Sequence, residues 1–172
     1  MAAHAASYRV LYRDIDSMGV LYYGRYLAMF EMGRVEWMRS EGCRYRDLER
    51  DHGVLLPVTE ASCSYRAPVE YDDLLIVRTE VARWSASRIA FSHQLVVPED
   101  SAAAGQALAA AGNVNPFPEE FWDGSGNRLC ALGEVELGCV RNEGMRPTRL
   151  PAPFRELLQE RVPERFQPRL QR

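Results

Sequence analysis

The sequence predicts an α+β fold, in which a long helix lies on one face of an antiparallel β-sheet. Two patterns support this prediction. A strongly apolar helical pattern runs from about Gly24 to Glu41, and strand-like runs occupy most of the chain after it. The length of 172 residues suits one domain with a substantial hydrophobic core.

The first elements are a strand, a turn and the long helix. Residues 8–13 are rich in β-favouring side chains and predict a strand, and residues 14–19 predict a tight acidic turn that ends at Gly19. Gly42 is suited to end the helix. Apolar residues cover most of the helix circumference, so we expect a helix buried on all sides. They are Leu27, Ala28, Met29, Phe30, Met32, Val35, Trp37 and Met38.

The rest of the chain predicts a connector, four strands and a second helix. Residues 44–52 form the connector, irregular or helical, and a short amphipathic helix fits Phe154 to Glu160. The strands are Val54 to Arg66, Leu74 to Trp84, Arg88 to Val97 and Arg128 to Arg141. We expect one domain over 1–172, with the short helix and a tail from about residue 152.

Residues 98–127 do not fit the strand pattern. An alanine-rich piece is followed by an aromatic, proline-rich piece, and a loop of this length is usually functional or disordered. Phe117, Phe121 and Trp122 favour order, because aromatic side chains are usually buried. We expect an ordered excursion that covers a site or an oligomer surface; a mobile hairpin extension is the alternative.

Composition excludes several classes of function. A net charge of −3 gives no basis for binding nucleic acid or anionic lipid. No apolar run approaches the ~18 residues of a membrane span, and the N-terminus lacks the features of a signal peptide. All 21 basic residues are Arg, which excludes Schiff-base lysine chemistry and leaves phosphate binding to arginine.

The cysteines indicate no metal or disulfide framework. Cys43, Cys63, Cys130 and Cys139 show no CxxC spacing and stand apart from the three histidines. We therefore expect reduced thiols in a cytoplasmic protein, without a metal or cofactor.

Asp16 is the candidate reactive group. The strand-turn-helix order can place its carboxylate near free backbone N–H groups at a helix start, beside Met18, Val20 and Leu21, which can partly desolvate it. The amides of Tyr23 and Gly24 can hold a developing oxyanion. Gly24 also permits close backbone approach to an acyl group. In the alternative interpretation, Asp14 or Asp16 shapes an Asx-turn, and Asp14 is the better candidate for that role.

Three segments carry a family resemblance. The motif Asp-x-Asp-x-x-Gly-Val-x-Tyr from Asp14, followed by Tyr26 and an apolar helix with internal Glu and Arg, resembles the hotdog-fold acyl-CoA thioesterases. It is most similar to the 4-hydroxybenzoyl-CoA thioesterase-like group. The segments Ser64 to Leu74 and Ser85 to Arg88 add to the resemblance, which covers roughly residues 8–97 and 128–150.

The resemblance implies a curved antiparallel sheet around a central helix, in a homodimer or homotetramer with active sites between subunits. It places Asp16 at the catalytic aspartate, as nucleophile or general base, and Tyr23 where a backbone N–H polarises the thioester carbonyl. Many relatives have His at the Tyr23 position, so no imidazole assists here. The excursion at 98–127 has no counterpart in minimal members, so the resemblance does not give the acyl group.

The resemblance also implies an acyl-CoA or acyl-carrier-protein substrate, with contacts from Gly24, Tyr26, Arg34, Ser87 and Arg88. Arg88 suits the CoA phosphates, as does a second cluster formed by Arg141, Arg146 and Arg149.

Glu31 and Arg34 are spaced to form a salt bridge in an apolar setting, but Glu31 can instead touch the acyl group or position water. Two other functions stay open. One is a hotdog dehydratase or hydratase, which the absence of His from residues 5–51 disfavours; the other is a non-catalytic acyl-CoA or carrier-protein binding module.

Overall fold

The computed structural model describes residues 3–111, 116–118, 121–122 and 126–162. Within these residues, no helix is long and apolar enough to span a lipid bilayer. The helices are the 3₁₀ turn η1 (Tyr12–Asp14), α1 (Arg25–Ser40), α2 (Tyr45–His52), α3 (Ser101–Ala111) and α4 (Ala152–Arg161). The strands are β1 (His4–Arg9), β2 (Val54–Leu55), β3 (Val58–Tyr65), β4 (Leu74–Trp84), β5 (Arg88–Pro98), β6 (Asn127–Gly138) and β7 (Val140–Arg141).

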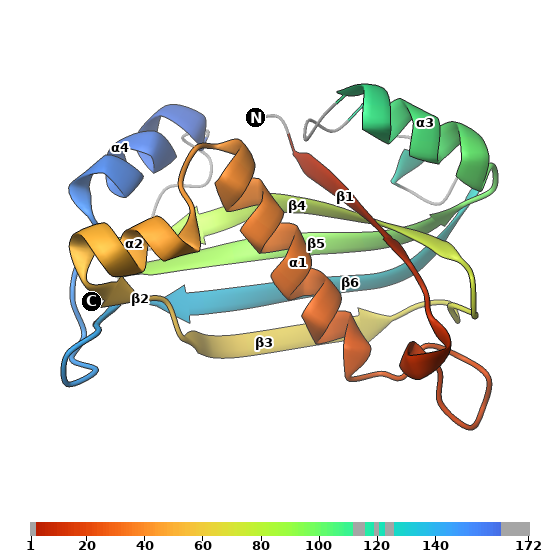
Figure 1. Ribbon diagram of the computed structural model, residues 1–172, viewed down its shortest axis with the longest axis horizontal. Helices are drawn as coiled ribbons and strands as arrows, with labels where there is room; N and C mark the ends of the chain where they lie inside the picture. The colour runs from red at the N-terminus through yellow and green to blue at the C-terminus, as the bar shows by residue number, and fades with distance from the viewer. Residues whose placement is uncertain (1–2, 112–115, 119–120, 123–125, 163–172) are drawn as a thin grey trace.

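A five-stranded antiparallel sheet forms the centre of the fold, with the strand order β1-β4-β5-β6-β3. Helix α1 crosses one face of this sheet, as Figure 1 shows. The main core lies between them and includes Phe30 and Trp37 from the helix and Leu75, Phe91 and Leu137 from the strands. The predicted α+β arrangement is therefore confirmed.

Two glycines allow α1 to approach the sheet closely. A Cβ at Gly33 would lie 2.3 Å from the Thr79 hydroxyl, and a Cβ at Gly133 would lie 2.2 Å from the Phe30 ring. Real Cβ atoms do not approach other atoms so closely, so any larger residue would push the helix away from the strands.

Three element predictions differ from the structure. The first strand is His4–Arg9, not residues 8–13, because pairing with β4 imposes strand structure on a segment of low β-propensity. The predicted strand from Val54 to Arg66 is interrupted at Pro57 and forms β2 and β3. The predicted strand from Arg128 to Arg141 is likewise divided into β6 and β7.

The expectation that α1 is buried on all sides is wrong. Leu27 is 44% exposed and Glu31 is also exposed, although Phe30, Arg34 and Trp37 are buried. The sheet covers only one face of the helix, and apolar periodicity alone did not reveal which residues would remain in contact with solvent.

The excursion packs against sheet residues that are separate from the main core beneath α1. A second apolar cluster joins Leu108 of α3 and Trp122 to Leu74 and Ile76 of β4 and Val96 of β5. The described part of the excursion thus covers apolar surface of the sheet, whereas residues 112–115, 119–120 and 123–125 lie outside the described residues.

Candidate functional site

The acidic loop before α1 is held as a small hairpin. Ile15 and Leu21 form an antiparallel bridge, and the Asp16 N–H donates to the Val20 carbonyl at 2.9 Å. Gly19 closes the turn with φ of +82°, a left-handed conformation that glycine adopts without steric cost. The loop therefore presents Asp16 at the start of α1.

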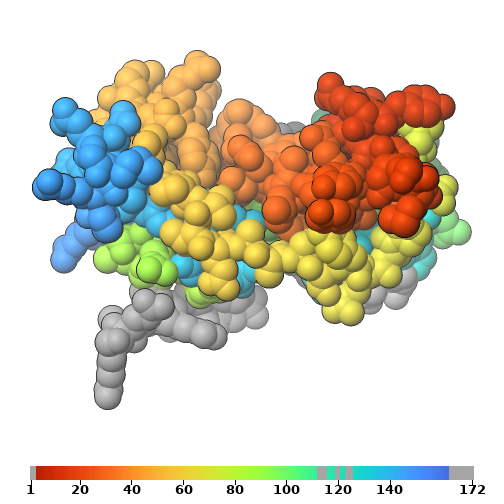
Figure 2. Space-filling model, turned by 90° about the horizontal axis from the view of Figure 1, so that it is seen from below, coloured from red at the N-terminus to blue at the C-terminus, as the bar shows by residue number. Residues whose placement is uncertain are grey.

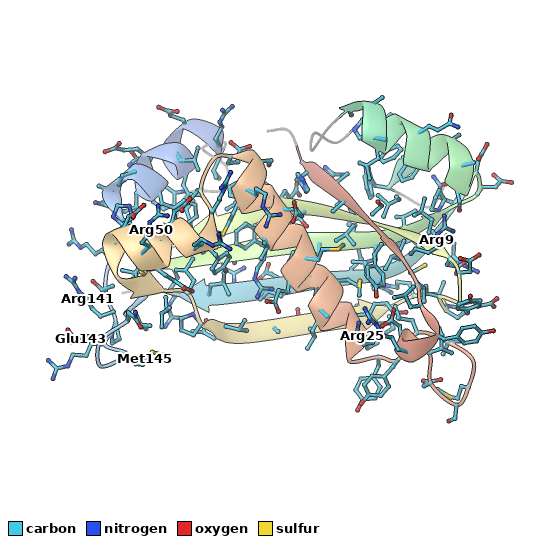
Figure 3. All side chains as sticks on the ribbon, in the orientation of Figure 1. Arg9, Arg25, Arg50, Arg141, Glu143 and Met145 are labelled. Atoms are coloured by element: carbon cyan, nitrogen blue, oxygen red, sulfur yellow. The ribbon has the colours of Figure 1, made fainter. Side chains whose placement is uncertain are left out.

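Asp14 anchors this loop from below. Its fully buried carboxylate accepts hydrogen bonds from the Tyr8 hydroxyl at 2.7 Å and the Leu11 N–H at 3.0 Å, and its Oδ1 lies 2.7 Å from an Arg25 guanidinium nitrogen. Burial alone would raise the pKa of Asp14, but these hydrogen bonds and the Arg25 charge outweigh it and lower the pKa. Figure 3 labels Arg25 at this end of the molecule.

Asp16 forms the Asx-turn that we expected from Asp14. Its Oδ1 accepts the Met18 N–H at 2.8 Å, whereas the described residues supply no hydrogen bond to Oδ2. The carboxylate is half-buried, but Met18 is 79% exposed and shields it little within one chain. Asp16 thus keeps one oxygen free to face a ligand.

The start of α1 offers two free amides. The Tyr22 N–H donates to the Asp14 carbonyl at 2.8 Å, and the Arg25 N–H donates to the Tyr22 carbonyl at 2.8 Å. Among the hydrogen bonds of the described residues, none uses the N–H of Tyr23 or of Gly24. These amides lie at the positive end of the helix dipole, where they can stabilise an oxyanion.

Aromatic rings surround these amides. The rings of Tyr22 and Tyr23 lie 4.4 Å apart, and a Cβ at Gly24 would lie 2.8 Å from the Tyr22 ring. The missing side chain of Gly24 therefore makes room for Tyr22. Tyr26 is buried, and burial raises its pKa to about 12, so its hydroxyl is neutral at physiological pH. As a core residue, Tyr26 supports the site from beneath.

Glu31 and Arg34 form a loose pair at 4.0 Å, but the expectation that both are buried is wrong. The side chain of Glu31 is 66% exposed, whereas that of Arg34 is 9% exposed. Arg34 Nε is buried and has no partner among the described atoms. Glu31 therefore lies on the open face of α1, and Arg34 lies in the protein interior.

Ser87 and Arg88 lie away from Asp16 within one chain. The β4–β5 turn that holds them is at the end of the sheet beside α2 and α4, opposite the start of α1 (Figure 1). Arg88 already donates to Glu136 at 2.8 Å. Arg141, labelled in Figure 3, lies at this same far end.

One contact at the site has no counterpart in the sequence predictions. The Tyr65 hydroxyl, at the end of β3, donates to the Tyr23 carbonyl at 3.1 Å. The sequence does not indicate this contact, because the position of β3 beside the start of α1 depends on tertiary structure. His93 is packed against the sheet and helix rather than at this site: it is buried, lies 3.0 Å from the Thr79 hydroxyl and stacks on Phe30.

The arrangement suits attack on an acyl carbonyl. The Asp16 carboxylate, which has one free oxygen, lies on the loop that leads to the unpartnered amides of Tyr23 and Gly24. The carboxylate can act as a base or nucleophile, and the two amides can form an oxyanion site. Within the described residues, no group of three or more His, Cys, Asp or Glu side chains could hold a metal ion.

Comparison with known proteins gives consistent matches. The profile of the thioesterase-like superfamily matches residues 10–162. The acyl-CoA thioesterase YbgC of Haemophilus influenzae is 34% identical over 88 residues, which span 51% of this chain but only 65% of that relative, less than two thirds. The acyl-CoA thioester hydrolase YbgC of Escherichia coli O6:H1 is 30% identical over 93 residues, 54% of this chain and 69% of that one.

A solved structure extends the likeness to nearly the whole chain. The DHNA-CoA thioesterase from Staphylococcus aureus has a TM-score of 0.72 at 24% identity, with 93% of this chain and 91% of that chain covered. This likeness concerns the fold, and it confirms the predicted hotdog fold.

Proposed function

Because the chain belongs to the thioesterase-like superfamily, we propose that it hydrolyses an acyl-CoA thioester to the free acid and CoA. The observation that carries the proposal is the free Oδ2 of Asp16 on the loop that ends at the unpartnered amides of Tyr23 and Gly24. Relatives named acyl-CoA thioesterases support the substrate class.

Two routes fit this geometry. As a general base, Asp16 takes a proton from water, and the hydroxide attacks the thioester carbon. As a nucleophile, it attacks that carbon itself and forms a mixed anhydride that water then cleaves. In both routes the carbonyl oxygen becomes an oxyanion that the Tyr23 and Gly24 amides stabilise, the C–S bond breaks, and the CoA thiolate leaves.

We also propose that two copies of the chain complete the site. Strand β3 is the last strand of the sheet, and seven of its eight residues are exposed. Figure 2 shows this edge (yellow) open beside α1 (orange). An unpaired strand edge is a ready template for pairing with another chain.

Two-fold antiparallel pairing of β3 edges would set the far end of the partner beside the Asp16 loop. Ser87 and Arg88 could then face the substrate only across the interface, and the exposed Tyr23 side chain would be covered. A homodimer is the smallest such assembly, and a homotetramer could be built from two. Light scattering that finds only monomers at assay concentrations would exclude this proposal.

Two further features of the proposal concern location and carrier. The four cysteines carry free thiols, which supports a cytoplasmic location. An acyl-carrier protein remains the alternative carrier of the acyl group.

The hydratase alternative gains no support, because His4 and His93, two of the three histidines, are buried in the sheet rather than at the site.

Release of free thiol from a panel of aryl-CoA and fatty acyl-CoA esters tests the proposal. We expect turnover of at least one ester. Binding of these esters, measured by calorimetry, without any thiol release would instead identify a non-catalytic binding module.

A further inference from the structure

Tyr65 connects the edge strand β3 to the start of α1. Its hydroxyl lies 3.1 Å from the Tyr23 carbonyl oxygen, and because a carbonyl only accepts, the hydroxyl must donate. Its ring meets the Tyr26 ring edge to face, with centroids 4.9 Å apart. Tyr65 is 50% exposed, so this polar contact lies at the surface of the candidate site rather than in the core.

The contact bears on the Gly24 amide through the geometry of the peptide bond. The described chain has no cis peptide bond, and in a trans peptide the C=O and N–H point in opposite directions. The Tyr23 carbonyl and the Gly24 N–H belong to one peptide unit. A donor that fixes the carbonyl on one side therefore fixes the direction of the Gly24 N–H on the other.

The two free amides differ in what fixes them. The peptide that carries the Tyr23 N–H is fixed within its own turn, since the Tyr22 carbonyl accepts the Arg25 N–H at 2.8 Å. In the peptide that carries the Gly24 N–H, the Tyr23 carbonyl accepts two hydrogen bonds among the described residues. One is a long bond of 3.4 Å from the Tyr26 N–H, and the other comes from the Tyr65 hydroxyl. Only the Gly24 amide thus depends on another element.

We propose that Tyr65 is a positioning residue that holds the Gly24 amide toward the thioester carbonyl and polarises it. This inference rests on the proposed function. A hydrogen bond to the carbonyl side of a peptide also strengthens the N–H on its other side as a donor, because bonds in a chain polarise one another. The effect is expected mainly in kcat, since the oxyanion forms only in the transition state.

Three properties support a positioning role. Burial raises the pKa of Tyr65, so its hydroxyl remains protonated and able to donate at neutral pH. Tyr65 does not contact the reacting Asp16 through any hydrogen bond among the described residues. Its strand is the sheet edge that a second copy would pair with, so assembly would also fix the position of the hydroxyl.

The test compares Tyr65→Phe with Tyr65→Ala and a control, Tyr71→Phe. Tyr71 is a similarly exposed tyrosine that stacks on Tyr12 at 3.9 Å, and the described residues show no hydrogen bond to its hydroxyl. Tyr65→Phe keeps the ring on Tyr26 and should keep the melting temperature, while kcat falls about three- to tenfold, the usual net value of one hydrogen bond. KM should be unchanged, and Tyr71→Phe should match wild type. In Tyr65→Ala, which also removes the ring, both kcat and the melting temperature should fall.

An NMR measurement tests the geometry without catalysis. In Tyr65→Phe, the ¹⁵N–¹H resonance of Gly24 should move more than that of Tyr23. An unchanged kcat in Tyr65→Phe, or an unmoved Gly24 resonance, would overturn the inference. Absence of turnover in wild type together with a moved Gly24 resonance would contradict the proposed function while supporting the placement of Tyr65.

Discussion

Replacement of Asp14 by Ala should destabilise the loop that carries Asp16. The substitution leaves the Tyr8 hydroxyl and the Leu11 N–H without their acceptor, at a cost of about 1–3 kcal/mol each. The Arg25 side chain is 36% exposed, so loss of its ion pair adds only about 0–1 kcal/mol. Because these groups act together, we expect a total loss of about 3 kcal/mol in the free energy of unfolding.

Urea unfolding at pH 7 measures this loss, and for a chain of this size it corresponds to about 6–12 °C in melting temperature. The control is Asp51→Ala, which removes an exposed carboxylate bonded to Arg50 and should leave the urea concentration at the unfolding midpoint unchanged. Unfolding of Asp14→Ala at the same urea concentration as wild type would contradict this anchoring role of Asp14.

The lowered pKa of Asp14 also sets a pH window for this difference. The carboxylate is charged in both folded and unfolded chains above the unfolded value of 3.8, so its stabilisation is complete there. As pH falls below that value toward the lower folded pKa, the unfolded chain binds the proton first. The difference in the free energy of unfolding between wild type and Asp14→Ala should therefore become smaller only below about pH 4.

Two further predictions concern the core beneath α1. Burial lowers the pKa of His4 from 6.5 to about 4. As pH falls below 6.5, His4 is therefore protonated in the unfolded chain but stays neutral in the folded chain. Between pH 7.5 and pH 5 this difference should lower the free energy of unfolding by about 2 kcal/mol. In urea unfolding His4→Phe should reduce the pH dependence by that amount, and an unreduced dependence would contradict the burial argument. Gly33→Ala should lower the melting temperature by several degrees, since its Cβ would meet Thr79 at 2.3 Å. Gly105→Ala, a helical glycine whose Cβ would lie 3.7 Å from Leu74, should be neutral or stabilising, and equal effects of the two substitutions would speak against the close packing of α1.

Much of the fold could be predicted from local pattern. The helix predicted over Gly24 to Glu41 is observed as Arg25–Ser40, and the strand from Leu74 to Trp84 has the predicted bounds. The strand His4–Arg9 could not be predicted, because His-Ala-Ala-Ser has little strand preference and pairs with β4 for tertiary reasons. The exposure of Glu31 was missed for the same kind of reason: an almost all-apolar helix does not indicate which side the sheet covers.

The site was predicted in outline, whereas its hydrogen bonds were not. The sequence motif directed attention to Asp16 and to the amides at Tyr23 and Gly24, which the structure does bring to one loop and helix start. It assigned the Asx-turn to Asp14, but that bond belongs to Asp16, and Asp14 is instead a buried anchor. Spacing cannot distinguish two acids two residues apart when burial decides their roles. The contact of Tyr65 joins residues 42 positions apart and left no local trace.

The proposed mechanism requires the Asp16 carboxylate to act as the base or nucleophile. The decisive comparison is kcat for thiol release in wild type and in Asp16→Asn, beside the affinity of both proteins for a thioether analogue of the best substrate, which cannot be hydrolysed. We predict a fall in kcat of at least ~100-fold, as for loss of a general base or nucleophile, with the affinity for the analogue changed less than about twofold. A kcat within about threefold of wild type would contradict the assignment of Asp16, even if the protein proves to be a thioesterase.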